Sequence, residues 1–181
     1  WLLKYKGKKR LAESFAEVIY NKILEELSDL STMENFNNTI LIPIPLSKKR
    51  LRERGYNQAE LICRELIKIN NTRSADAKPA RQSAGEALAN RHGIDEKLNL
   101  SLEKNILVKP KETRHQAQIE NRAERLENII GSFAIKSGEE IKGRNIILID
   151  DITTTGATLT EAKKTLKQAS VRKVIAFTVA H

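Results

Sequence analysis

The chain has 181 residues, of which 40% are hydrophobic and 30% charged, and its formal net charge is +9. This composition is typical of one globular domain with a full core, and no apolar run is long enough to span a membrane. The single cysteine, Cys63, excludes an internal disulfide and a cysteine-only zinc cluster, while the positive charge implies an anionic partner, either nucleic acid or a polyphosphate substrate. We therefore expect a cytoplasmic protein without membrane insertion.

Two helices and a strand are predicted in the first 70 residues. Residues 9–30 carry apolar side chains three and four positions apart, which predicts an amphipathic helix covering one face of a sheet. A strand is predicted over 39–44, where Pro43 suits a strand end better than a central position. A second helix is predicted over 58–69.

A basic segment follows the predicted strand. Five of the seven residues 48–54 are Lys or Arg and one is acidic. Because the segment comes after a strand end, we expect a loop at the same sheet edge as Asp150. Lys49, Arg50 and Arg52 are candidates for binding pyrophosphate, since Arg forks and Lys point charges both suit that ligand. The alternatives are a solvated basic loop and a nucleic-acid-binding patch.

Residues 70–99 differ in composition from the rest of the chain because they include few large apolar residues. We expect them to form a surface insertion that the core does not require, within a single domain over 1–181. Strands are predicted over 105–108 and 131–136, and a helix over 121–130.

The stretch 146–158 carries the strongest functional signal. Its first four residues are apolar and three are β-branched, which predicts a strand buried on both faces, as in a parallel sheet. Asp150 and Asp151 end that strand, where an open α/β sheet has its ligand site. A hydroxyl-rich turn with one glycine, Gly156, then opens a helix predicted over 159–168, and such a turn presents backbone N–H groups to an anion. We therefore predict a sugar-phosphate site, with phosphate in the turn and ribose hydroxyls donating to the carboxylates.

Residues 146–158 also allow a purely structural interpretation, and two other phosphate-binding motifs are excluded. The structural alternative is a buried strand that ends in an ordinary capped turn. No Lys follows Gly156, which excludes a Walker A loop, and a lone glycine does not match a dinucleotide-binding fingerprint.

Residues 173–180 are largely apolar on both faces and predict a further buried strand.

The stretch 146–158 matches a known signature through its strand, acidic pair, Thr-Thr-Gly and final Thr, and it resembles the phosphoribosyl-pyrophosphate (PRPP) signature of type I phosphoribosyltransferases. Three further motifs are Ile42-Pro43-Ile44-Pro45-Leu46, Arg52-Glu53-Arg54-Gly55-Tyr56-Asn57-Gln58, and Thr113-x-x-Gln116 with Arg125-x-x-Asn128 and Phe133. With them the chain, except 70–99, resembles the ComF family, which is linked to late competence and DNA uptake in bacteria. This resemblance implies an α/β, type I phosphoribosyltransferase (Rossmann-like) fold with a mainly parallel sheet flanked by helices.

The sequence departs from the family pattern in two places. Family members often carry an N-terminal four-cysteine zinc module, and we expect none here because the sequence has one cysteine. The segment after Pro45 is Leu46-Ser47-Lys48, where the family often has Leu-His-Pro.

The resemblance implies a phosphoribosyltransferase in which an acceptor nucleophile, not identified by the sequence, displaces pyrophosphate from C1 of Mg²⁺-bound PRPP. It assigns the ribose hydroxyls, and indirectly the Mg²⁺ shell, to Asp150 and Asp151. Thr113, His115 and Gln116 are candidates for a mobile loop, with His115 either a proton carrier or a bystander. The residues assigned to the 5′-phosphate are Thr153, Thr154, Thr155, Gly156, Ala157 and Thr158.

Two other functions stay open. One is a non-catalytic PRPP sensor or adaptor that retains the pocket. The other is a competence accessory that binds single-stranded DNA through residues 48–54 or contacts a partner in the competence machinery.

Overall fold

The computed structural model describes residues 8–29, 38–76, 98–110, 128–153 and 155–180. Its main sheet consists of four parallel strands in the order β2-β1-β5-β6. The strands are β1 (Thr39–Pro43), β2 (Leu100–Leu102), β5 (Asn145–Ile152) and β6 (Lys173–Ala180).

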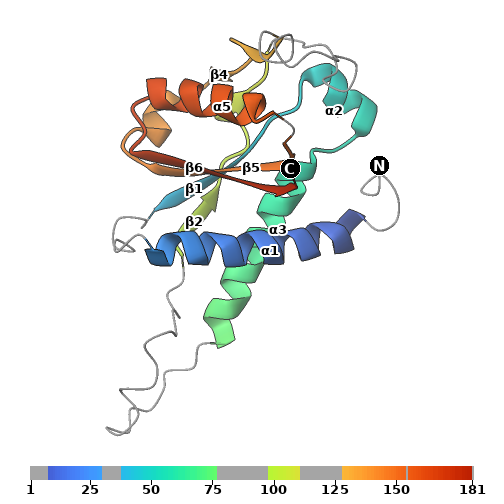
Figure 1. Cartoon of the computed structure of the whole chain (residues 1–181), viewed down its shortest axis with the longest axis vertical. Helices are drawn as coiled ribbons and strands as arrows, with labels where there is room; N and C mark the ends of the chain where they lie inside the picture. The colour runs from blue at the N-terminus through green and yellow to red at the C-terminus, as the bar shows by residue number, and fades with distance from the viewer. Residues whose placement is uncertain (1–7, 30–37, 77–97, 111–127, 154, 181) are drawn as a thin grey trace, which may run out of the picture.

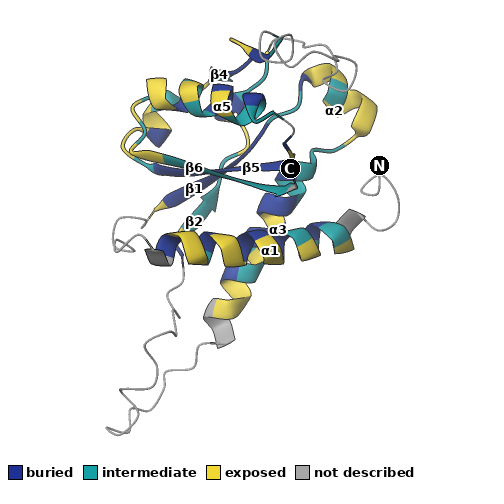
Figure 2. Cartoon of the chain, in the orientation of Figure 1, coloured by how far each residue is buried: buried dark blue, intermediate teal, exposed yellow. Residues whose placement is uncertain are grey.

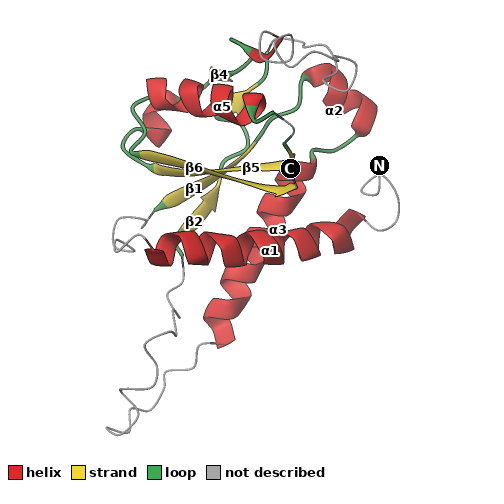
Figure 3. Ribbon diagram, in the orientation of Figure 1, coloured by secondary structure: helices red, strands yellow, loops and turns green. Residues whose placement is uncertain are grey.

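Helices cover both faces of this sheet (Figures 1 and 3). α1 (Lys8–Asp29) and α3 (Gln58–Asp76) lie on one face, and α5 (Ala157–Gln168) lies on the other. This arrangement confirms the predicted parallel sheet flanked by helices. None of the described helices is both long and apolar enough to cross a membrane.

The central strand β5 is a continuous apolar run because both of its faces are covered. Side chains alternate between the two faces, as the period of a strand requires. Ile147 and Ile149 point to the α1–α3 side, whereas Ile146 and Leu148 point to the α5 side, and all four are completely buried. Burying a side chain of this size stabilises a fold by about 1.5–3 kcal/mol.

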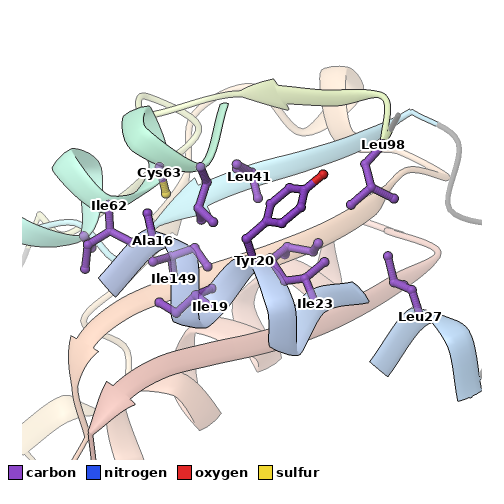
Figure 4. Close-up of a cluster of buried hydrophobic side chains, with 13 residues drawn as sticks. Ala16, Ile19, Tyr20, Ile23, Leu27, Leu41, Ile62, Cys63, Leu98 and Ile149 are labelled. Atoms are coloured by element: carbon purple, nitrogen blue, oxygen red, sulfur yellow. The ribbon is translucent and has the colours of Figure 1, made fainter. Parts of the chain in front are cut away.

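One core lies between α1, α3 and the sheet (Figure 4). α1 contributes buried residues at helical spacing, namely Ala16, Ile19, Tyr20, Ile23 and Leu27. At one end of this core the Tyr20 hydroxyl donates to Asn70 Oδ1 at 3.1 Å, and Asn70 Nδ2 donates to the Leu98 carbonyl at 2.8 Å. Asn70 and Leu98 are both buried, so the two ends of the predicted insertion belong to the core.

A second core lies beneath α5. It includes a two-stranded antiparallel sheet of β3 (Leu107–Val108) and β4 (Ala134–Ile135), and the short 3₁₀ helix η4 (Gly138–Ile141). Glu161 of α5 is buried, and its Oε1 accepts a hydrogen bond from the Gly131 N–H at 2.8 Å. This bond fixes the segment before β4 against α5.

Several predicted elements differ from the structure. Residues 48–54 form a helix, α2 (Lys48–Arg54), so the prediction of a loop was wrong. α3 continues seven residues past the predicted end at residue 69, to Asp76. β2 was not predicted, because it has three residues and begins beside the segment assigned to the insertion.

For residues 173–180 the prediction of a strand is confirmed, but the prediction that this strand is buried was wrong. They form β6, but this strand pairs with β5 alone among the described strands, and residues 174–179 are only half-buried. An edge position therefore explains why the strand is apolar on both faces without being fully buried. Of the predicted helix 121–130, only 128–130 are described, and 128–129 are helical.

Candidate phosphate and ribose site at the sheet switch point

The order of the strands reverses between β1 and β5. The chain leaves β1 through α2 and α3 to reach β2 on one side, and it leaves β5 through α5 to reach β6 on the other. In open α/β sheets, ligands bind outside the carboxyl ends of the strands at such a switch point. Asp150 and Asp151 lie at this end of β5, and α2 follows the same end of β1.

The two residues of the acidic pair, Asp150 and Asp151, differ in how far they are exposed to solvent. Asp150 is 9% exposed, whereas Asp151 is half-buried and Ile152 is 60% exposed. Asp150 Oδ1 accepts a hydrogen bond from the Asp151 N–H, and Asp151 Oδ1 accepts one from the Ile152 N–H, both at 2.9 Å. These carboxylates therefore bond to the end of their own strand.

Burial raises the pKa of Asp150 to about 8, and the adjacent Asp151 carboxylate acts in the same direction. The Asp151 N–H and the Lys109 ammonium lower this pKa but do not restore the usual value. Asp150 thus holds its proton at neutral pH in the free protein. A ligand that needs the ionised carboxylate must supply a cation or strong hydrogen-bond donors.

The turn before α5 is built around Gly156, whose φ of 72° is in the left-handed region that favours glycine. Thr153 is buried, and its Oγ1 accepts the Gly156 N–H at 3.1 Å, while Thr155 Oγ1 accepts the Ala157 N–H at 3.4 Å. The threonine hydroxyls thus satisfy N–H groups at the start of a twelve-residue helix. A phosphate oxygen can replace them, because the same N–H groups and the helix dipole attract an anion.

The predicted phosphate residues are therefore brought together in one turn. Thr155, Gly156 and Thr158 are half-buried, and Ala157 begins α5. Thr154 lies outside the described residues, as do the predicted mobile-loop residues Thr113, His115 and Gln116.

Lys109 belongs to this site and was not predicted. It follows β3, its ammonium is near enough to Asp150 to lower that pKa, and its Nζ lies 5.3 Å from the centre of the Phe133 ring. Phe133 is buried beside β4, so the small β3–β4 sheet presents a cation to the acidic pair. No sequence pattern predicted this placement of Lys109, because it depends on a second sheet.

The predicted pyrophosphate residues lie on α2. Lys49 and Arg52 are exposed, and Arg50 is half-buried (Figure 2). The helix is capped at both ends: Ser47 Oγ accepts the Arg50 N–H at 3.4 Å, and Gly55, with a φ of 76°, donates its N–H to the Leu51 carbonyl. α2 therefore carries its basic side chains on a short rigid helix after the carboxyl end of β1.

The site fits a magnesium ion only in combination with a ligand. Within the described part of the chain, no group of three or more His, Cys, Asp or Glu side chains could hold a metal ion. Two adjacent carboxylates provide hard oxygen atoms that suit Mg²⁺, but a complete shell needs further oxygens from water and substrate phosphates.

Comparisons with known proteins show which proteins this chain is similar to. Residues 99–181 match the family model described as phosphoribosyl transferase domain. The competence protein ComFC of Bacillus subtilis is 30% identical over 149 residues, covering 77% of this chain and 43% of that protein. Competence protein F of Haemophilus influenzae is 27% identical, covering 74% of this chain and 46% of its own length.

A third relative, the competence protein ComFC of Streptococcus pneumoniae, is 42% identical over 73 residues, covering 40% of this chain and 32% of that protein. The chain thus spans less than half the length of each of these three relatives. Among solved structures, a hypoxanthine phosphoribosyltransferase from Staphylococcus aureus aligns with 92% of this chain and 62% of its own, at 13% identity and a TM-score of 0.40.

Proposed function

Because the chain is a member of the ComF family with a type I phosphoribosyltransferase fold, we propose that it binds PRPP and displaces pyrophosphate from it. The observation that carries this proposal is the acidic pair at the end of β5, directly before the hydroxyl-lined start of α5. A sugar phosphate has both matching parts, namely an anionic end and a ring with neighbouring hydroxyl donors.

The turn binds the 5′-phosphate in this proposal. The N–H groups of Gly156 and Ala157 exchange their threonine acceptors for phosphate oxygens, and the released hydroxyls of Thr153 and Thr155 become donors to the same ligand. Thr154 and Thr158 complete the predicted set. Charge-assisted hydrogen bonds of this kind are roughly twice as strong as neutral ones.

Asp150 and Asp151 accept hydrogen bonds from the ribose hydroxyls. Asp150 must ionise to do so fully, and Lys109 favours that change because its positive charge lowers the pKa of Asp150. Mg²⁺, when bound with PRPP, neutralises charge on the pyrophosphate and on the acidic pair. Its oxygen ligands come mainly from the substrate and water.

Pyrophosphate lies towards α2, with Lys49, Arg50 and Arg52 as its cationic partners. The bond between C1 and the pyrophosphate oxygen breaks, a bond from the acceptor to C1 forms, and the acceptor loses a proton. Positive charge develops on the sugar as the leaving group departs. The contribution of the protein is therefore mainly positioning and charge stabilisation.

The experiment that tests this function combines binding with turnover. The protein is incubated with Mg²⁺ and ribose-labelled PRPP together with a panel of nucleobases and amines, and pyrophosphate release is measured. We expect binding of PRPP, and release that depends on one class of acceptor. Binding with no release for any acceptor would instead indicate a PRPP sensor or adaptor, and no binding would contradict the proposal.

A competence accessory that binds single-stranded DNA is the second candidate. The specific observation in its favour is α2, which is exposed along most of its length and has five basic residues out of seven. The names of the curated relatives point to competence, so a partner in the competence machinery belongs to the same proposal.

A further inference from the structure

A side-chain amide joins the start of α3 to the end of β1. Asn57 Nδ2 donates to the Ile44 carbonyl at 2.9 Å, and the Ile44 N–H donates in turn to the Ile149 carbonyl of β5 at 2.8 Å. Asn57 Oδ1 accepts the Ala59 N–H at 3.0 Å and so caps α3. One amide group therefore connects the first turn of α3 to the two central strands at the switch point.

The bond from Asn57 to Ile44 closes a loop, residues 45–56, that contains all of α2. None of the seven residues of α2 is buried, so burial of apolar side chains contributes little to the placement of this helix (Figure 2). Its first turn is capped by the buried Ser47, and at its last turn Arg54 Nη1 donates to Gln58 Oε1 at 3.0 Å. The position of α2 relative to β1 and β5 thus depends on the residues that close the loop.

Four residues of the Arg-Gly-Tyr-Asn-Gln motif take part in closing this loop. Gly55, with a φ of 76°, ends α2 and turns the chain towards α3. Arg54 and Gln58 join the two helices, and Asn57 joins α3 to β1. The proposed function assigns no ligand contact to these four residues, but the cationic side chains assigned to pyrophosphate lie between the two ends of the loop that they close.

We propose that Asn57 is a positioning residue of the pyrophosphate subsite, and that its amide holds residues 45–56 against the end of β1. The helix α2 then stays beyond the carboxyl ends of the central strands, where Lys49, Arg50 and Arg52 meet pyrophosphate. This inference rests on the proposed function. The acidic pair and the phosphate turn follow β5, which pairs with β1 and β6 along its length, so they should not depend on this amide.

The test uses Asn57→Ser, because serine caps a helix about as well as asparagine but lacks the amide that reaches the Ile44 carbonyl. Affinities are measured for two probes, PRPP and ribose 5-phosphate, each with Mg²⁺, because they differ only in the pyrophosphate on C1. We expect the variant to bind PRPP about tenfold more weakly, which corresponds to the loss of one charge-assisted hydrogen bond to pyrophosphate. It should bind ribose 5-phosphate as tightly as the wild type.

Asn70→Ser is the matched control. It removes the same kind of bond, from Asn70 Nδ2 to the Leu98 carbonyl at 2.8 Å, in the second half of α3 and before the start of β2. We expect it to lower the urea midpoint and to leave the affinities for both probes unchanged. Asn57→Ser should lower the midpoint no more than this control does.

Two outcomes would overturn the inference while the PRPP site stands. In the first, Asn57→Ser binds PRPP as tightly as the wild type. In the second, the variant weakens PRPP and ribose 5-phosphate by the same factor, or no longer unfolds cooperatively, which would mean that the amide supports the whole fold and not the placement of α2. A wild-type protein that does not bind PRPP at all would instead contradict the proposed function, and this inference with it.

Discussion

Asp150 is buried, lies next to a second carboxylate and is close to the end of the central strand. Placing a second acid beside a buried acid costs stability, because the charged form loses its hydration and meets a like charge. Proteins keep such arrangements where function needs them. Lys109 offsets part of the cost, but not enough to return the pKa of Asp150 to its usual range.

Replacing both acids distinguishes their role in PRPP binding from their effect on the stability of the fold. We expect Asp150→Asn/Asp151→Asn to lose PRPP binding while its urea midpoint stays the same or rises. The amides still accept the N–H groups of Asp151 and Ile152, but hydrogen bonds from the ribose to ionised acceptors are lost, at roughly 1.5–3 kcal/mol each. A destabilised variant that binds PRPP with native affinity would contradict the assignment of the pair.

The raised pKa of Asp150 also predicts how stability depends on pH. The unfolded chain loses this proton near pH 4, whereas the folded protein retains it until about pH 8. Between these values the folded state binds more protons, so the free energy of unfolding falls as the pH rises. We expect the free energy of unfolding of Asp150→Asn to match that of the wild type near pH 4 and to exceed it by several kcal/mol at pH 8, since each pKa unit corresponds to about 1.4 kcal/mol. Urea titrations at both pH values test this, and an equal difference at both would contradict it.

At the level of single residues, the sequence predicted groups that lie close together in the chain. Asp150, Asp151 and the threonine turn are adjacent, and local chemistry determines their environment. Lys109 was not predicted as a site residue because it comes near the acidic pair through tertiary packing, from the β3–β4 sheet. No local sequence pattern encodes that placement.

α2 shows why short helices are difficult to predict. Leu51 is its single apolar residue and is 45% exposed, so the helix has no periodic apolar face. Its ends are determined by Ser47 and by the left-handed Gly55. Both cap residues are present in the sequence, but the loop was predicted because the segment follows a strand end. The longer α1 and the buried β5 were predicted correctly because each has a sustained apolar pattern.

The basic residues of α2 can bind either pyrophosphate or nucleic acid, and a triple substitution distinguishes the two functions. We expect Lys49→Gln/Arg50→Gln/Arg52→Gln to weaken PRPP binding at least about tenfold, because each charge-assisted contact to pyrophosphate contributes strongly. Binding of single-stranded DNA by the wild type should be weak, steeply salt-dependent and competed by PRPP. Fluorescence anisotropy over a range of salt concentrations measures both.

A matched control lies on α5. Lys163→Gln/Lys164→Gln/Lys167→Gln removes the same number of charges from one side of a helix whose start forms the phosphate turn. It should weaken DNA binding through net charge and leave PRPP affinity unchanged. Tight DNA binding at physiological salt that PRPP does not compete, and that depends on α2 alone, would favour the DNA-binding accessory.

The described part of the molecule has one parallel sheet with a separate core on each face, and the small antiparallel sheet belongs to one of these cores. The two cores share the central strands, so β1 and β5 are held from both sides and the switch point between them is rigid. The sequence predicted this fold class from the composition of β5 and the family resemblance. It did not predict the antiparallel β3–β4 sheet, because pairing of two-residue strands leaves almost no pattern in a sequence.

Replacing the segment between α3 and β2 tests how much of the chain is required for folding. Asn70 and Leu98 are part of the core, so we narrow the predicted dispensable segment from 70–99 to residues 77–97. Replacing 77–97 with about eight Gly and Ser residues should give a cooperatively unfolding protein, because each doubling of loop length changes the closure cost by only about 0.6 kcal/mol. Urea unfolding and size-exclusion chromatography measure the result.

Asn70→Ala is the control for that replacement. It leaves the Tyr20 hydroxyl and the Leu98 carbonyl without their buried partner, which should cost about 1–3 kcal/mol of unfolding free energy. Aggregation of the linker variant, with a normal control, would mean that residues 77–97 cover an apolar face.

The most direct test of the PRPP site is thermal unfolding with competing ligands. At a concentration one hundred times its dissociation constant, PRPP with Mg²⁺ should stabilise the native state by about 2.7 kcal/mol, and so raise Tm by roughly 5 °C or more. ATP with Mg²⁺ at the same concentration should raise Tm far less, since the turn at Gly156 lacks the lysine that binds a triphosphate. Equal shifts from PRPP and ATP would contradict a site specific for a phosphorylated ribose.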